Sequence, residues 1–153
     1  MTLLLAFLIG FFAGLRSLTA PAATAWAVYL GWLKLDRPLA LIGSVPGVTI
    51  LTLLALIELV ADKLPRTPSR TAPPGLIARI VMGGLTGAAI AAGATQGVFI
   101  GALLGAAGGI AGCFVGYRVR TGLVHALGLR DLYVALAEDI VAIAGSLWVV
   151  SRF

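Results

Sequence analysis

The stretch that decides the fold runs from Ile80 to Tyr117 and reads IVMGGLTGAAIAAGATQGVFIGALLGAAGGIAGCFVGY. It carries no charged residue, and it is much longer than the roughly 20 apolar residues that one membrane-spanning helix needs. The short sequence ATQG at 94–97 lies near its middle and is typical of a turn. The stretch therefore predicts two spans, over about 76–93 and 98–117, with lipid rather than water around them.

The composition of the whole chain agrees with a lipid environment. Of the 153 residues, 60% are hydrophobic and 11% are charged, and the mean hydropathy is +1.07. A soluble domain carries roughly 25% charged residues, because it needs a polar surface around its core. We therefore expect an all-α integral membrane protein with little mass outside the bilayer.

Three further apolar segments predict the remaining spans, over about 3–33, 39–62 and 132–150. The first is longer than a bilayer core is thick, and it contains Arg16 and Pro21. We expect one tilted or kinked helix, or two pieces broken near Arg16–Pro21. Each half alone is short for a crossing, which favours a compact bundle of about five transmembrane helices in a single domain, 1–153.

The positive charges predict the orientation of these spans. Seven of the eleven lie in two connections, 63–79 and 118–130, and with five spans both connections fall on one side. Positive loops stay in the cytoplasm, so the amino terminus is expected inside and the carboxyl terminus outside. Two full crossings in the first segment would instead put the amino terminus outside.

Several other classes of protein are excluded by the same counts. The basic residues are separated by apolar runs and form no continuous patch, so nucleic-acid binding is not expected. The single Cys113 and the single His125 have no metal or haem spacing, and no cofactor is expected. The start of the chain resembles a secretory signal, but it lacks a basic region before the apolar stretch. We expect a retained membrane segment there.

Small residues recur at intervals of four, a spacing that lets helices approach closely in lipid. Two readings are open: packing within one bundle, or a homodimer or sliding interface. The glycines concerned are Gly10, Gly14, Gly101, Gly105, Gly108, Gly109, Gly112 and Gly116.

A weak internal echo also accompanies these glycines. The pattern G-x-F-x-G-x-R-x-x-T occurs at 10–19 and again at 112–121. With five spans the two copies cross in opposite directions, which would make an inverted repeat of the kind common in transporters. A second echo, of ALIE at 55–58 with ALAE at 135–138, has a different offset and argues against it.

Charged residues inside the predicted spans are the candidates for a functional site, because charge is costly in lipid. One interpretation is a substrate or ion site, in which carboxylates take up protons or a cation and arginines hold a small anionic solute. The other is a set of buried ion pairs that fixes helix register. The candidates are Arg16, Glu58, Asp62, Arg118, Glu138 and Asp139.

The basic connection after the second span offers a weaker candidate. Lys63, Arg66 and Arg70 could bind an anionic lipid headgroup. The preference of positive loops for the cytoplasm explains these residues without such a role.

Four short motifs resemble one known family. They are ELVADKLP at 58–65, LAEDIVA at 136–142, GLRS at 14–17 and PSRTAPP at 68–74. Together they are similar to the DUF4126 family of small bacterial integral membrane proteins, over nearly the whole chain. The resemblance implies a multi-span protein of the bacterial inner membrane and no known activity. It also implies that Arg16, Glu58, Asp62, Lys63, Glu138 and Asp139 belong to the family pattern, without assigning a role to any of them.

Three functions follow from these observations as hypotheses. The first is a small transporter- or channel-like protein, which requires Arg16, Glu58 and Glu138 around a water-accessible cavity. The second is a scaffold that binds anionic lipid or another membrane protein, in which the same residues are paired and dry. The third is an intramembrane enzyme, although no nucleophile motif surrounds Asp62 or Asp139.

Overall fold

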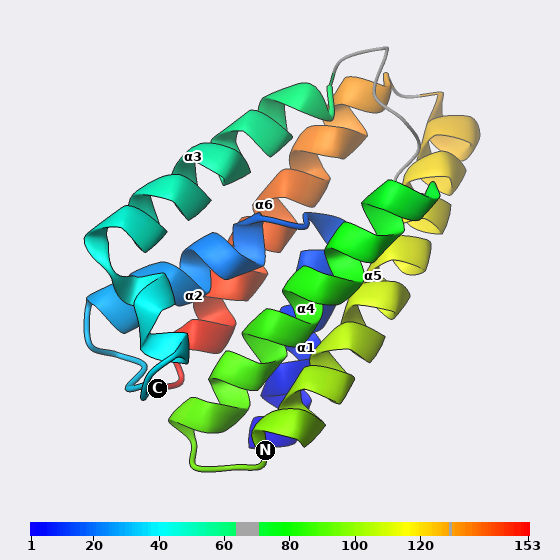
Figure 1. Ribbon diagram of the computed structural model, residues 1–153. Helices are drawn as coiled ribbons and strands as arrows, with labels where there is room; N and C mark the ends of the chain where they lie inside the picture. The colour runs from blue at the N-terminus through cyan, green and yellow to red at the C-terminus, as the bar shows by residue number, and fades with distance from the viewer. Residues whose placement is uncertain (64–70, 129) are drawn as a thin grey trace.

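The computed structural model describes residues 1–63, 71–128 and 130–153, and no strand occurs among them. This part of the chain forms a single bundle of six α-helices (Figure 1). Three of them, α4 to α6, are long and apolar enough to cross a membrane, and α1 and α3 are shorter apolar helices. The elements are α1 (Thr2–Leu15), α2 (Thr19–Tyr29), the 3₁₀ helix η1 (Leu39–Gly43), α3 (Val45–Ala61), α4 (Pro73–Gly93), α5 (Val98–Leu127) and α6 (Asp131–Val150).

Local sequence explains where several helices begin and end. Ser44 precedes α3, and its hydroxyl accepts a hydrogen bond from the Gly47 N–H at 3.2 Å, as an N-cap does. Pro73 and Pro74 open α4, where the missing N–H is not needed. Gly128 follows α5 with φ of 61°, a left-handed conformation that ends helices and suits glycine.

The glycine repeats pack α1, α4 and α5 into what we call the glycine-packed group. On α5, Gly105 faces the backbone of Gly83 and Gly87 on α4, and Gly112 faces the backbone of Phe11 and Gly14 on α1. A Cβ atom at these glycines would collide with backbone, so glycine is required for the close approach. These contacts lie within one chain, as expected for packing inside a single bundle. Gly116 of α5 is buried as well.

The direction of α1 relative to α5 shows that the inverted-repeat prediction is wrong. Gly10 of α1 lies against Gly105 of α5, and Gly14 lies against Gly109. Residue numbers rise together along both helices, so the two helices are parallel. Copies in an inverted repeat would run in opposite directions.

The first apolar segment forms a hairpin of two short helices. The α1 helix ends at Leu15, Arg16 is extended with φ of −139°, and α2 begins at Thr19 and returns toward the starting end (Figure 1). At 14 and 11 residues, α1 and α2 are about 21 Å and 17 Å long, less than the bilayer core of about 30 Å. The structure thus has six helices where the sequence predicts five spans.

Both chain termini therefore lie at the same end of the bundle, which we call the terminal end (Figure 1). A buried cluster there joins Leu5 of α1, Ala27 of α2 and Val149 of α6. The turn that follows α2 reaches the end of α4, where Leu33 packs against Gly93. This arrangement differs from the expectation of termini on opposite sides, because the first segment turns back instead of crossing once.

The helices α2, α3 and α6 form the outer group, which is packed less closely than the glycine-packed group. On α3 only Val48 and Ala55 are buried, and much of its apolar surface is open to lipid. The last turns of α3 and α5 and the first turns of α4 and α6 lie opposite the terminal end, and we call this side the charged end (Figure 1).

Candidate functional site: an ionic cluster at the helix break

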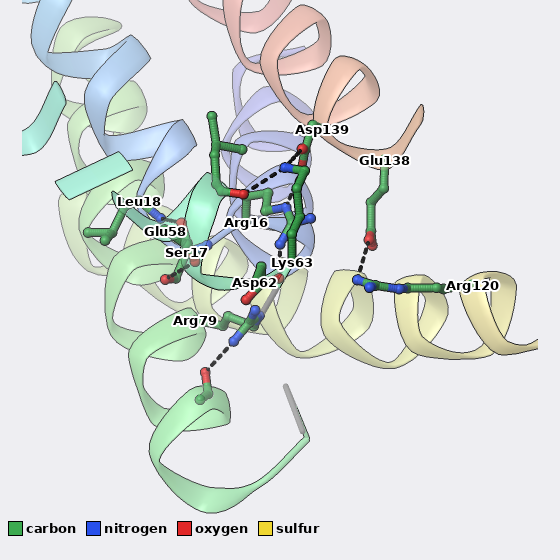
Figure 2. A network of polar contacts seen from close by, with 12 residues as sticks. Arg16, Ser17, Leu18, Glu58, Asp62, Lys63, Arg79, Arg120, Glu138 and Asp139 are labelled. Carbon is green, nitrogen blue, oxygen red and sulfur yellow. Dashed lines mark hydrogen bonds and ion pairs between the residues drawn. The ribbon is translucent and has the colours of Figure 1, made fainter. Parts of the chain in front are cut away.

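Arg16 lies in the extended link between α1 and α2 and is the centre of a buried ionic cluster (Figure 2). Its side chain has no exposed surface. The Nη1 atom pairs with the Asp62 carboxylate, and Nε donates to Asp139 Oδ1 at 2.6 Å. A guanidinium presents several donors in one plane, so it can hold two carboxylates at once.

Lys63 completes the cluster from the residue that follows Asp62. Its Nζ atom donates to Asp139 Oδ2 and to the Leu59 carbonyl, both at 2.6 Å. Each oxygen of Asp139 therefore meets a different cation. Of the three residues predicted to bind a lipid headgroup, Lys63 pairs with Asp139, and Arg66 and Arg70 lie outside the described residues.

Glu58 lies at the same break but binds backbone. Its carboxylate accepts hydrogen bonds from the N–H groups of Ser17 and Leu18, both at 2.8 Å, and from the Ser17 hydroxyl at 2.6 Å. These N–H groups precede α2, where a helix has donors without internal partners and a partial positive charge. Glu58 thus acts as the N-terminal cap of α2, supplied by another helix.

Arg79 plays the opposite role at the end of α1. It is 4% exposed, and its Nε atom donates to the Gly14 carbonyl at 3.0 Å. The last carbonyls of a helix lack internal partners and carry partial negative charge, so a cation suits them. A helix break at membrane depth is tolerated only where protein satisfies its backbone, and Arg79 and Glu58 do this.

A second ionic pair lies to the side of the Arg16 cluster (Figure 2). Arg120 of α5 donates to both oxygens of Asp131, at 2.7 Å and 2.5 Å, and its Nη1 atom is 3.8 Å from Glu138 Oε2. Arg118 is exposed on α5 and does not share the buried surroundings of Arg16. Of the six candidates, the structure thus brings together Arg16, Asp62 and Asp139, places Glu58 beside them, and sets Glu138 and Arg118 apart.

Two side chains at the helix break, those of Arg79 and Ser17, were not among the sequence candidates, and neither were Arg120 and Asp131 of the second ionic pair. Arg79 was counted as a loop charge, although it follows Pro73 and Pro74 by less than two helical turns and so falls inside the helix that they open. Ser17 carried no signal of its own, because its role depends on a break whose position the sequence left open. The proline pair could have revealed Arg79. Ser17 belongs to the GLRS motif at 14–17, but that motif assigns it no role.

Charge is divided between the two groups of helices. Arg120 lies on α5 of the glycine-packed group, and Arg16 directly follows α1 of the same group. Their carboxylate partners lie on α6 of the outer group or directly follow α3, and they are Asp62, Asp131, Glu138 and Asp139. Lys63 differs in linking the end of α3 to α6 within the outer group. The arginine pairs therefore act across the junction between the groups.

A pocket of about 300 Å³ lies elsewhere, between α2 and α3 toward the terminal end. It is mainly apolar, and Trp26 Nε1 donates to Thr52 Oγ1 at 3.0 Å within its wall. Its lining consists of Trp26, Tyr29, Val45, Val48, Thr49, Thr52 and Leu53. Within the described residues no group of three or more His, Cys, Asp or Glu side chains is placed to hold a metal ion.

Comparison with known proteins gives one match. The model of a family described as Domain of unknown function (DUF4126) matches residues 3–151. No curated protein matches the chain, and no solved structure does. The match covers both helix groups and the whole ionic cluster.

Proposed function

Since the chain belongs to the DUF4126 family, whose description names no activity, we propose from the geometry that it is a small transporter- or channel-like membrane protein. Its polar site is the cluster of Arg16, Asp62, Lys63 and Asp139. This cluster replaces the expected cavity around Arg16, Glu58 and Glu138, because Glu138 lies beside Arg120 and Glu58 binds backbone. The observation that carries the proposal is that these charges lie inside an apolar bundle, at the junction between its two groups of helices. The expected location is the bacterial inner membrane.

Energetics support a role beyond stability for this cluster. Charges are expensive at membrane depth, at about 2.5–3.5 kcal/mol each on insertion scales. A buried ion pair often contributes no more than apolar residues of similar volume would. Arg16, Asp62 and Asp139 thus join the two groups of helices at a higher cost in free energy than apolar side chains would. Ion pairs at this junction are useful if the two groups of helices must separate during transport.

The packing suggests which part moves. Glycine contacts lock α1, α4 and α5 together backbone to backbone, whereas α2, α3 and α6 pack more loosely. The described conformation is closed at the charged end, where Asp62 and Asp139 cover Arg16. In the proposal, transport proceeds through a second conformation in which the outer group moves away from Arg16, and the break between α1 and α2 serves as the hinge.

A scaffold is the second candidate, and the burial of the cluster favours it. Arg16 is fully buried and paired, as register-fixing charges should be, and the described pocket is lined by residues from α2 and α3 outside the cluster. In that case the ion pairs hold the helices in place and binding falls to other surfaces, such as the exposed Arg118 for anionic lipid. The two candidates differ in whether the cluster ever opens.

Reconstitution into liposomes tests the choice. The wild-type protein is assayed with a pH-sensitive dye inside the vesicles and with gradients of protons, acetate, phosphate and chloride in turn. We expect flux above that of empty liposomes, reduced at least tenfold by Asp139→Asn, because the neutral side chain cannot hold both Arg16 and Lys63. Arg118→Gln is the control and should keep wild-type flux. If wild-type vesicles match empty ones for every gradient, the transporter proposal fails and the scaffold stands.

A further inference from the structure

The two carboxylates on Arg16 are held in different ways. Asp139 is 6% exposed, lies within α6, and uses both oxygens on two cations, Arg16 and Lys63. Asp62 is the C-cap residue of α3, and its side chain is 16% exposed. It pairs with Arg16. Asp139 is therefore the fixed partner of Arg16, and Asp62 is the partner nearer the surface.

Asp62 is also poorly placed for a carboxylate. The end of a helix carries partial negative charge, so an acidic residue there is repelled by the helix that bears it. The attraction of Arg16 offsets this repulsion in the described conformation. Asp62 thus needs Arg16 for stability, and it stands at the point where α3 leads into the connection at the charged end.

Withdrawal of Asp62 would change the charge of the cluster in a defined way. Whatever else surrounds the cluster, the loss of the Asp62 carboxylate makes it more positive by one charge, while Arg16, Lys63 and Asp139 stay in place. Removing one member of a buried ion pair is strongly unfavourable, so a negative group in the vacated position would restore the balance of charge. A cation would add to the excess, and protonation of Asp62 would not remove it.

We infer that Arg16 and Lys63 form a site for a small carboxylate anion, and that Asp62 occupies this site until the anion displaces it. The inference rests on the proposed function, since it names the substrate class of the same site. The planar guanidinium of Arg16 matches a carboxylate through paired donors, and Lys63 supplies a second cation at the more exposed side of the cluster. Asp62 then competes with the anion for Arg16, and it supplies the negative charge of the site while no anion is bound.

Removal of Asp62 tests the site without any transport assay. The Asp62→Ala variant is purified in detergent, and its thermal unfolding is followed in sodium acetate and in sodium chloride of equal ionic strength. We expect a lowered melting temperature in chloride and a rise of about 3 °C or more in acetate, because acetate binds the folded state alone. Wild-type protein should show a much smaller difference between the two salts, since Asp62 competes with acetate.

Asp131→Ala is the matched control, because Asp131 is also an aspartate paired with an arginine, Arg120. The side chain of Asp131, however, is 60% exposed. This variant should respond equally to acetate and chloride. The inference is wrong if Asp62→Ala also responds equally to the two salts, or if Asp131→Ala gains as much from acetate. Should Asp62→Ala fail to fold, Asp62→Asn carries the same test, because its side chain is neutral but keeps its shape.

Two further arms complete the experiment. Octanoate acting at far lower concentration than acetate would assign the carboxylate to a membrane-borne fatty acid, and equal potency would assign it to a water-soluble acid. Stabilisation of Asp62→Ala by acetate with no flux in liposomes supports the anion site and rejects the transporter. Flux without acetate-specific stabilisation rejects the anion site and leaves the transporter in place.

Discussion

Glu58 illustrates how a charged side chain can be needed inside a membrane protein without touching a solute. Its carboxylate holds the N–H groups of Ser17 and Leu18 and the Ser17 hydroxyl, so three donors depend on it. Backbone donors that lose such a partner in partly buried surroundings cost free energy unless another acceptor replaces it. We therefore assign Glu58 to the structure of the helix break rather than to the anion site.

Replacement of Glu58 should accordingly lower stability. Glu58→Gln leaves one acceptor oxygen and no charge, and we expect a loss of about 1–3 kcal/mol in the free energy of unfolding, the usual cost of an unsatisfied buried donor. Denaturation in mixed detergent micelles measures it. Asp36→Asn, in the exposed turn before η1, is the control and should change the free energy by less than about 0.5 kcal/mol. A Glu58→Gln variant as stable as the wild type would contradict the capping role.

At the scale of elements, α5 is the helix on which the bundle is built. One glycine face contacts α4 and an adjacent face contacts α1, so the helix is covered on two sides by backbone. Farther along α5, a Cβ atom added at Gly122 would meet nothing. The same helix therefore offers glycines that packing requires and one that it does not.

Alanine substitutions along α5 should show this difference. Gly105→Ala places a methyl group against the Gly83 carbonyl, and overpacking of this kind costs about 1–3 kcal/mol. Gly122→Ala should be neutral or stabilising, because alanine favours helix over glycine by up to about 1 kcal/mol. Melting temperatures of the two variants in one detergent provide the comparison. Equal melting temperatures would show that the close approach of α4 and α5 is not required.

The elements that the sequence predicts best are those with local signals. The ATQG turn, the Pro73-Pro74 pair and the uncharged runs place α4 and α6 close to their observed bounds and place the start of α5 correctly. The predicted end of α5 at 117 is wrong, because the helix continues through Arg118 and Arg120 to Leu127. The sequence did not decide whether residues 3–33 form one kinked helix or two helices. The break at Arg16 depends on Glu58 and Arg79, which contact it from distant parts of the chain. The pairing of Arg16 with Asp62 and Asp139 also depends on the tertiary structure, so it could not be predicted from the sequence. The composition indicates only that charges in an apolar chain need partners.

For the whole molecule, the hairpin changes how the chain is threaded through the membrane. Both termini share one end (Figure 1). Among the described basic residues, only Lys34, Arg37 and Arg152 lie toward that terminal end. Since positive segments prefer the cytoplasm, we expect the charged end to lie inside.

Both termini should therefore face away from the cytoplasm. Fusions of alkaline phosphatase, which is active only outside, and of green fluorescent protein, which fluoresces inside, are compared at each terminus. We expect phosphatase activity and no fluorescence at both. A control fusion within the 94–97 turn, at the same end of the bundle, should behave as the termini do. If the fusions place the two termini on opposite sides of the membrane, the hairpin is wrong and residues 3–33 cross the membrane once.

The parallel contact between α1 and α5 has a consequence for how the protein is made. Gly10 meets Gly105 and Gly14 meets Gly109, and each partner is synthesised 95 residues later. Since α1 and α2 are each shorter than a bilayer crossing, we expect them to insert as a pair. We expect this pair to lack its contacts with Glu58, Arg79 and α5 until those parts of the chain are made. Newborn chains that stop short of α5 should be the preferred targets of membrane proteases.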